Sequence, residues 1–148
     1  MTIFLGTDHA GYKLKEKTKA YLLKRGLVVK DFGTGSEKSV DYPDFIIPVA
    51  KAAAKNKTAR GIVFGGSGIG ECVAANKVKG VLAALCYDSY TAKMSREHND
   101  ANVLCLGGRT VTKNWNLTKK VLDIWLKAKF SGEVRHVRRL KKIAKVER

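Results

Sequence analysis

The chain has 148 residues, a length that predicts a single domain over residues 1–148. Apolar residues make up 45% of it and charged residues 28%, a balance that excludes a disordered chain. No apolar run approaches the roughly 20 residues of a membrane span, and residues 1–6 lack the pattern of a signal peptide, so we expect a cytoplasmic protein. The 29 basic and 13 acidic side chains leave a net charge of +16, which favours anionic partners without saying which kind.

Apolar runs and amphipathic segments alternate along the chain. The predicted strands cover residues 2–6, 28–32, 61–64, 81–86 and 102–106, and the predicted helices between them cover 12–25, 45–55, 71–77 and 89–98. This alternation predicts an α/β fold: a doubly wound, three-layer, Rossmann-like domain around a five-stranded parallel sheet. Two C-terminal helices should follow, an amphipathic one at 114–129 and a basic one at about 134–148.

Polar residues and glycines follow four of the predicted strands, at Asp8-His9-Ala10-Gly11, at the loop 65–70, at Asp88 and at Gly107-Gly108-Arg109. Ligands bind beyond the carboxyl ends of parallel strands, so these residues should converge on one edge of the sheet. The loop, Gly65-Gly66-Ser67-Gly68-Ile69-Gly70, runs into a helix and could cradle an anion or a developing oxyanion. A purely structural turn is the alternative, and the dinucleotide-binding fingerprint is absent from this loop.

Several side chains are candidates for acid–base chemistry, although each also has a structural explanation. Glu71 begins a predicted helix, where a carboxylate could be a capping charge or a base. His98 ends a helix and could be its C-cap. His9 follows Asp8, a pair that can orient an imidazole. The three histidines are too scattered to indicate a metal site, and Cys72, Cys86 and Cys105 are expected to pack in the core.

The basic C-terminal segment contains Arg135 and Arg139, four residues apart and so on one helix face. Two guanidinium groups on one face can clamp a phosphate, whereas the alternative is a solvated basic helix.

These motifs together resemble the ribose-5-phosphate isomerase B family and the related galactose-6-phosphate isomerase subunits. The resemblance runs from about residue 3 to residue 144. It is carried by Asp8-His9-Ala10-Gly11, Asp41-Tyr42-Pro43-Asp44, Gly68-Ile69-Gly70, Ala74-Ala75-Asn76-Lys77, Arg96-Glu97-His98-Asn99, Ala101-Asn102-Val103-Leu104 and Arg135-His136.

The resemblance implies an enzyme that interconverts ribose 5-phosphate and ribulose 5-phosphate through a cis-enediolate. It implies no metal or nucleotide cofactor, and a homodimer whose two sites use residues of both subunits. His98 would help to open the furanose ring, with Asp8 nearby, and Arg135, Arg139 and His9 would hold the phosphate. The remaining substrate-binding residues would be Tyr42, Gly66, Gly68, Gly70, Asn99 and Arg109, and Asn99 and Arg109 could come from the partner chain.

The sequence departs from many family members at Gly65, where they carry the cysteine that serves as base. A second branch reads Gly-Gly-Ser-Gly-x-Gly-Glu, which matches residues 65–71 and makes Glu71 the expected base. The adjacent Cys72 is an alternative base, but it lies about 100° round the helix from Glu71. Ser67 and the loop N–H groups would stabilise the negative oxygen, and burial should raise the pKa of Glu71.

Other functions remain open on the sequence alone. The high charge would also suit a nucleic-acid-binding module, although no interleaved aromatic residues or reading motif support specific nucleic-acid binding. A phosphosugar-binding protein without catalysis is another possibility, and the same scaffold also resembles enzymes for hexose and tetrose phosphates. The sequence does not choose among these substrates, does not separate dimer from tetramer, and does not explain the charge.

Overall fold

Strands and helices alternate along the chain, which we describe from a computed structural model covering residues 1–147, apart from the side chain of Val111. The strands are β1 (Thr2–Thr7), β2 (Val28–Asp31), β3 (Arg60–Gly65), β4 (Ala83–Leu85) and β5 (Val103–Gly107). The helices are α1 (Tyr12–Lys24), α2 (Pro43–Lys55), α3 (Ile69–Asn76), α4 (Ser89–Glu97), α5 (Trp115–Lys127), preceded by a 3-10 turn η1 (Val111–Lys113), and α6 (Val134–Ala144).

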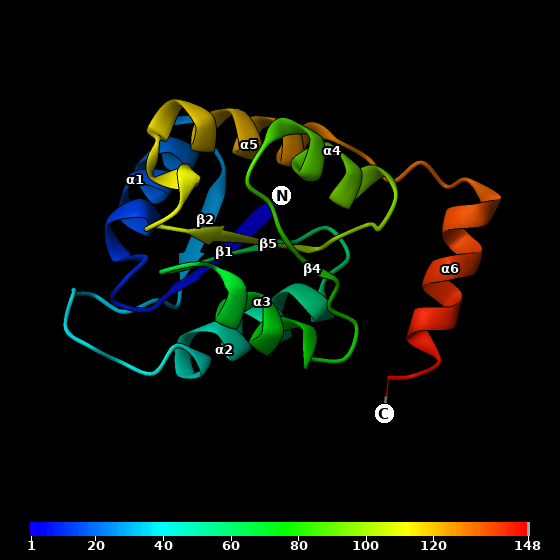
Figure 1. Ribbon diagram of the computed structural model, residues 1–148, viewed down its shortest axis with the longest axis horizontal. Helices are drawn as coiled ribbons and strands as arrows, with labels where there is room; N and C mark the ends of the chain where they lie inside the picture. Colours follow the sequence, from blue (N-terminus) through cyan, green and yellow to red (C-terminus); the bar gives the residue numbers. More distant parts are fainter. Residues whose placement is uncertain (148) are drawn as a thin grey trace.

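All five strands pair in parallel in the order β2-β1-β3-β5-β4, which confirms the predicted α/β fold (Figure 1). The strand order reverses direction between β1 and β3, and ligands bind in the crevice that such a reversal leaves at the carboxyl ends. β4 is shorter than the predicted 81–86, because the N–H of Leu82 donates instead to Oδ1 of Asn102 (2.9 Å).

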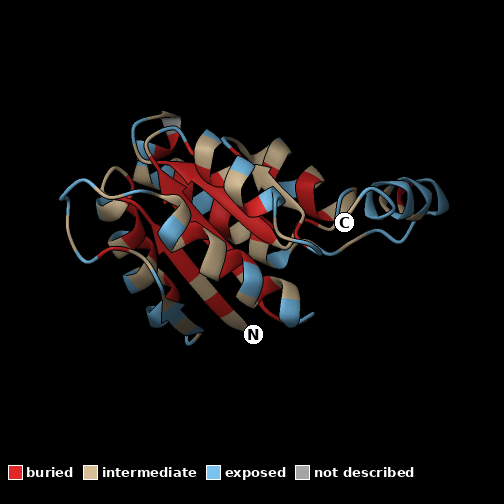
Figure 2. Ribbon diagram, turned by 90° about the horizontal axis from the view of Figure 1, so that it is seen from below, coloured by how far each residue is buried: buried red, intermediate tan, exposed pale blue. Residues whose placement is uncertain are grey.

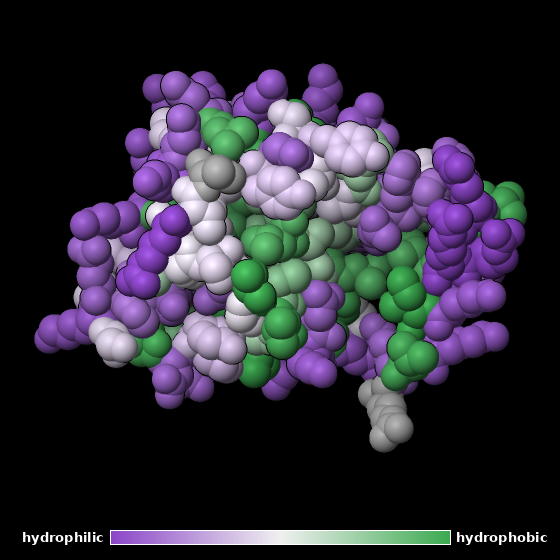
Figure 3. Space-filling view, viewed as in Figure 1, coloured by the Kyte–Doolittle hydropathy of each residue, from purple (hydrophilic) through white to green (hydrophobic). Residues whose placement is uncertain are grey.

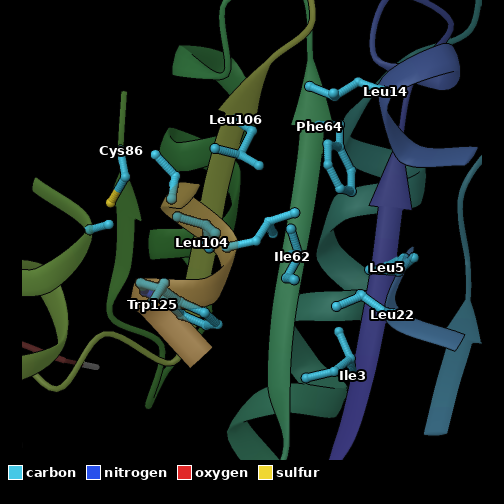
Figure 4. Close-up of a cluster of buried hydrophobic side chains, with 13 residues drawn as sticks. Ile3, Leu5, Leu14, Leu22, Ile62, Phe64, Cys86, Leu104, Leu106 and Trp125 are labelled. Carbon is cyan, nitrogen blue, oxygen red and sulfur yellow. The ribbon is translucent and has the colours of Figure 1, made fainter. Parts of the chain in front are cut away.

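Helices cover both faces of the sheet and make the three layers: α1, α4 and α5 lie on one face, and α2 and α3 on the other (Figure 1). Alternate strand residues supply the two cores. Ile62 and Phe64 of β3 face α1 and α5, where Trp125 is buried, whereas Val63 between them faces α2 (Figure 4). Burial on both faces explains why the central strands β1, β3 and β5 are mainly apolar runs in the sequence.

α6 stands apart from these layers, and Figure 2 shows it as an exposed arm beyond the edge of the domain. It occupies much of the predicted basic segment 134–148, whose last residue lies outside the described part of the chain. A groove of about 320 Å³ separates α6 from the body, and Figure 3 shows hydrophobic atoms along this side of the helix. None of the described helices is long and apolar enough to cross a membrane.

Candidate active site

The glycine loop joins β3 to α3 at the carboxyl edge of the sheet. Gly68 is the N-cap of α3 and has φ +80°, a left-handed conformation. A methyl group there would lie 2.7 Å from Cδ1 of Leu85, so both the backbone and the space require glycine. The N–H groups of Gly108 and Arg109 donate to the carbonyls of Gly65 (2.7 Å) and Gly66 (2.9 Å), which fixes the loop to the end of β5.

Glu71 lies in the first turn of α3, and its side chain is buried, with 3% of the residue exposed. Its carboxylate occupies the space beside Gly65, where a Cβ atom would overlap both carboxylate oxygens. Burial raises the pKa of Glu71, the negative charge of Asp8 raises it further, and backbone N–H groups at the helix start act in the opposite direction. The predicted upward shift of the pKa of Glu71 is therefore found in the structure.

Asp8 directly follows β1 and is also buried. Its Oδ1 atom accepts hydrogen bonds from the N–H groups of Ala10 (2.9 Å) and Gly11 (3.1 Å). The sequence suggested that Asp8 could orient His9, but the imidazole of His9 has a different hydrogen-bond partner. The N–H of Val40 donates to Nδ1 of His9 (3.2 Å). An Nδ1 atom that accepts leaves the proton of a neutral imidazole on Nε2, where it can be donated to an anion.

Three further candidates lie around the same loop. Ser67 is exposed, and its Oγ accepts from the N–H of Ile69 (3.2 Å). Tyr42 packs over Gly70, where a Cβ atom would lie 3.0 Å from Cζ of the tyrosine ring. Arg109 extends across Gly66, since a Cβ atom on Gly66 would lie 3.6 Å from Cδ of Arg109. The carboxyl edge of one chain thus assembles Asp8, His9, Tyr42, Gly66, Ser67, Gly68, Gly70, Glu71 and Arg109.

The other four candidates lie at the amino edge of the sheet. His98 is the C-cap of α4, the helix that leads back to the start of β5, and Asn99 follows it. Arg135 and Arg139 belong to α6, which lies at the end of the molecule opposite the carboxyl ends of the strands (Figure 1). The five residues of β5 alone separate the two edges by about 16 Å. One chain therefore does not bring all the predicted site residues together.

Two contacts, one at His98 and one at Cys72 next to Glu71, were not anticipated from the sequence. The ring of His136 stacks on the ring of His98, with centroids 4.3 Å apart and planes inclined by 13°. The Cys72 thiol donates to the carbonyl of Ala83 (3.5 Å), and a hydrogen bond with Cys105 lowers the pKa of Cys72 to about 7. Cys72 is half-buried, whereas Cys86 and Cys105 are buried as expected. The Arg135-His136 pair was the available sequence signal for the first contact.

The fold and the carboxyl-edge residues define an α/β domain with an anion-binding glycine loop beside a buried carboxylate. The model of the ribose/galactose isomerase family matches residues 3–143, so the chain belongs to this family of isomerases. It is 41% identical over 145 residues to ribose-5-phosphate isomerase B of Escherichia coli, covering 98% of this chain and 95% of the relative.

Solved structures agree with this assignment. Ribose-5-phosphate isomerase B of Clostridium thermocellum is 51% identical with a TM-score of 0.95, covering 99% of this chain and 97% of that one. The Mycoplasma genitalium protein of the same name, solved with bound ribulose-5-phosphate, is 44% identical with a TM-score of 0.92, covering 99% and 95%.

Proposed function

We propose that this isomerase interconverts ribose 5-phosphate and ribulose 5-phosphate by moving a proton between C2 and C1 of the open-chain sugar. The observation that carries the proposal is the buried carboxylate of Glu71, held beside the glycine loop in the space that Gly65 leaves free. The Escherichia coli and Clostridium thermocellum relatives are named for this activity, and the Mycoplasma genitalium relative holds ribulose-5-phosphate.

Glu71 acts as the base in this reaction. Its carboxylate removes the proton from C2 of the aldose, the electron pair forms the C1–C2 double bond, and the carbonyl oxygen at C1 becomes negative. The resulting cis-enediolate collapses when Glu71 returns the proton to C1 and the proton of the 2-hydroxyl moves to O1. Ser67 and the loop N–H groups stabilise the negative oxygen, and the raised pKa of Glu71 makes it a stronger base.

The remaining candidates bind the substrate and open its ring. His98 moves the proton between the ring oxygen and the 1-hydroxyl as the furanose opens, with Asp8 nearby. Arg135, Arg139 and the Nε2–H of His9 hold the phosphate. The substrate is further surrounded by Tyr42, Gly66, Gly68, Gly70, Asn99 and Arg109. No metal or nucleotide takes part in these steps.

We further propose that the chain forms one isomerase domain and works as a homodimer with shared sites. The support is the separation of the candidates, since Glu71 and His98 lie at opposite edges of the sheet. A two-fold axis can bring the carboxyl edge of one chain against the amino edge of its partner and complete two sites. Free thiols at Cys72, Cys86 and Cys105 suit the reducing cytoplasm, where we place the protein.

The test is the conversion of ribose 5-phosphate by the purified protein, with a metal chelator present. We expect turnover in the parent and a loss of about a hundredfold or more in Glu71→Gln, the size of a general-base contribution. Glu37→Gln, which changes an exposed glutamate paired with Lys13, is the matched control and should keep the parent rate.

A parent protein that leaves ribose 5-phosphate unchanged but isomerises a hexose or tetrose phosphate would replace the proposed substrate. Tight phosphosugar binding without turnover of any substrate would replace the isomerase with a binding protein.

A further inference from the structure

His136 forms the buried contact between α6 and the rest of the chain. It is the buried residue of α6, with 4% of its surface exposed, whereas its neighbours Arg135 and Val137 are exposed and half-buried. Its ring lies flat against that of His98, with 4.3 Å between the centroids. The stack therefore joins the imidazole assigned to ring opening to the helix that carries the two phosphate-binding arginines.

A hydrogen bond holds the two histidine-bearing segments together. The N–H of Ser131 donates to the carbonyl of Glu97 (2.9 Å), which ties the chain before α6 to the end of α4. The carboxylate of Glu133 forms an ion pair with Nε of Arg135 (2.8 Å) and lies 3.9 Å from Nε2 of His136, beyond hydrogen-bond distance. The start of α6 is thus fixed next to His98.

The surroundings of His136 favour the neutral imidazole. Burial lowers its pKa, and His98 and Arg135 lower it further, while Glu133 acts in the opposite direction. Its Nε2 has no hydrogen-bond partner among residues 1–147. A neutral ring without such a partner contributes to this contact mainly through its flat face, which restricts the orientation of the His98 ring.

We propose that His136 is a positioning residue, which holds the imidazole of His98 by ring stacking in the orientation that opens the sugar ring. This inference rests on the proposed function, in which His98 opens the furanose form of ribose 5-phosphate. It adds a role for a side chain that need not touch the substrate. A misplacement of about 1 Å in an acid–base group can cost as much as a hundredfold in rate.

The two reaction directions give a readout specific to ring opening. Ribose 5-phosphate is mainly a closed furanose, whereas ribulose 5-phosphate stays open because its 5-hydroxyl is esterified. A defect in ring opening therefore slows the forward reaction, while the reverse reaction can still release the open-chain aldose. A general loss of structure, or of phosphate binding, lowers both directions together.

The experiment compares His136→Leu, which removes the flat ring, with His136→Phe, which keeps it. We expect His136→Leu to lower forward kcat about tenfold or more and largely to keep the reverse rate, and His136→Phe to restore the forward rate. Arg138→Gln, an exposed change on α6, is the control and should leave both rates unchanged. Thermal unfolding of each variant checks that it is folded.

A second measurement tests whether His136 acts through His98. In a His98→Asn background, adding His136→Leu should cause no further loss, because the group that it positions is already gone. The ring protons of His98 should also lose their ring-current NMR shift in His136→Leu and keep it in His136→Phe. Equal losses in both directions, additive effects in the double variant, or an unchanged NMR shift would overturn the positioning role.

The outcomes for the parent separate this inference from the proposed function. A parent inactive in both directions would remove the proposed function, whatever the NMR shift of His98. An active parent whose His98→Asn variant slows both directions equally would keep the isomerase and overturn the ring-opening assignment, and the role of His136 with it.

Discussion

At the scale of single residues, Gly65 leaves the space that the carboxylate of Glu71, the proposed base, occupies. A Cβ atom at this position would overlap the Glu71 carboxylate, so a side chain at position 65 and the present position of Glu71 exclude each other. A cysteine at position 65 would therefore require Glu71 to move. The sequence indicated the glutamate through its motif, but the steric reason needed coordinates.

We expect Gly65→Ala to lower kcat/KM about a hundredfold, because the added methyl group displaces the carboxylate from the reacting carbon. The measurement is steady-state kinetics together with thermal unfolding, which should show a folded protein. Gly35→Ala is the matched control, since a Cβ atom at that exposed glycine meets nothing within 4 Å. An active Gly65→Ala enzyme would mean that the base is not held in this space.

The pKa of Glu71 leads to a prediction about pH. Burial raises this pKa and Asp8 raises it further, so the carboxylate should become protonated, and the enzyme inactive, at a higher pH than an exposed glutamate would allow. Carboxyl ¹³C NMR of the free enzyme and the acid limb of the rate profile measure it. Asp8→Asn removes the neighbouring charge and should move the titration of Glu71 to lower pH. A titration at the ordinary glutamate value would contradict the effect of burial.

At the scale of elements, the alternation of apolar strands and amphipathic helices was sufficient to predict the parallel sheet and its helices. The strand order was not predictable, because an apolar run does not indicate which strand it pairs with. The short β4 was not predictable either, because Asn102, distant in sequence, takes the hydrogen bond of Leu82. The glycine loop and the polar residues after β1 and β5 were correctly expected at one edge of the sheet. The hydrogen-bond partner of His9 was not predicted. The N–H of Val40 that donates to it belongs to a loop whose path the sequence does not indicate.

The position of that loop depends on a buried ion pair between α1 and the end of β2. Nζ of Lys15, whose side chain is 2% exposed, donates to Oδ2 of Asp31 (2.7 Å), and the N–H of Gly33 donates to Oδ1 of Asp31 (2.9 Å). The next residue, Thr34, donates its N–H to the carbonyl of Thr7 (3.1 Å). The ion pair thus fixes the beginning of the loop that reaches His9.

We expect Asp31→Asn to lower the free energy of unfolding by about 2 kcal/mol at neutral pH, because the buried ammonium of Lys15 loses one of its two carboxylate partners, Asp31 and Glu16. Burial tends to raise the pKa of Asp31, but hydrogen bonds from Lys15, Lys19 and Gly33 outweigh it and leave the pKa lowered. A lowered pKa stabilises the fold above the unfolded-state pKa, and this stability is lost as pH falls through the folded-state value. The difference between parent and variant should therefore shrink in acid.

Denaturant titrations from neutral pH into acid, at a fixed protein concentration, measure the difference in the free energy of unfolding between the parent and Asp31→Asn. Glu37→Gln, which breaks an exposed pair with Lys13, is the control and should cost less than about 1 kcal/mol. A difference between parent and Asp31→Asn that stayed constant into acid would show that the charge of Asp31 is not what stabilises the loop.

At the scale of the whole molecule, the candidate site is divided between the two ends of one chain. Hydrophobic and charge patterns in the sequence identify elements and single residues. They do not show how one chain sits against another, and so they do not show which edges of two chains meet. α6 leaves the body and exposes a groove lined by Leu82, Phe130, Val137, Leu140 and Ile143. An arm of this kind, carrying Arg135 and Arg139, suits contact with a second copy of the chain.

Complementation between two impaired variants tests this arrangement. Glu71→Gln changes the carboxyl edge and His98→Asn changes the amino edge, so each variant alone should convert ribose 5-phosphate far more slowly than the parent. In a mixed dimer with shared sites, the chain carrying His98→Asn supplies an intact Glu71 and its partner supplies an intact His98, which restores one site of the two. Random mixing of unfolded chains and refolding should therefore recover about a quarter of the parental activity, because half of the dimers are mixed. Sites contained within single chains would give no recovery at any mixing ratio, and sedimentation would still report whether the dimer had formed.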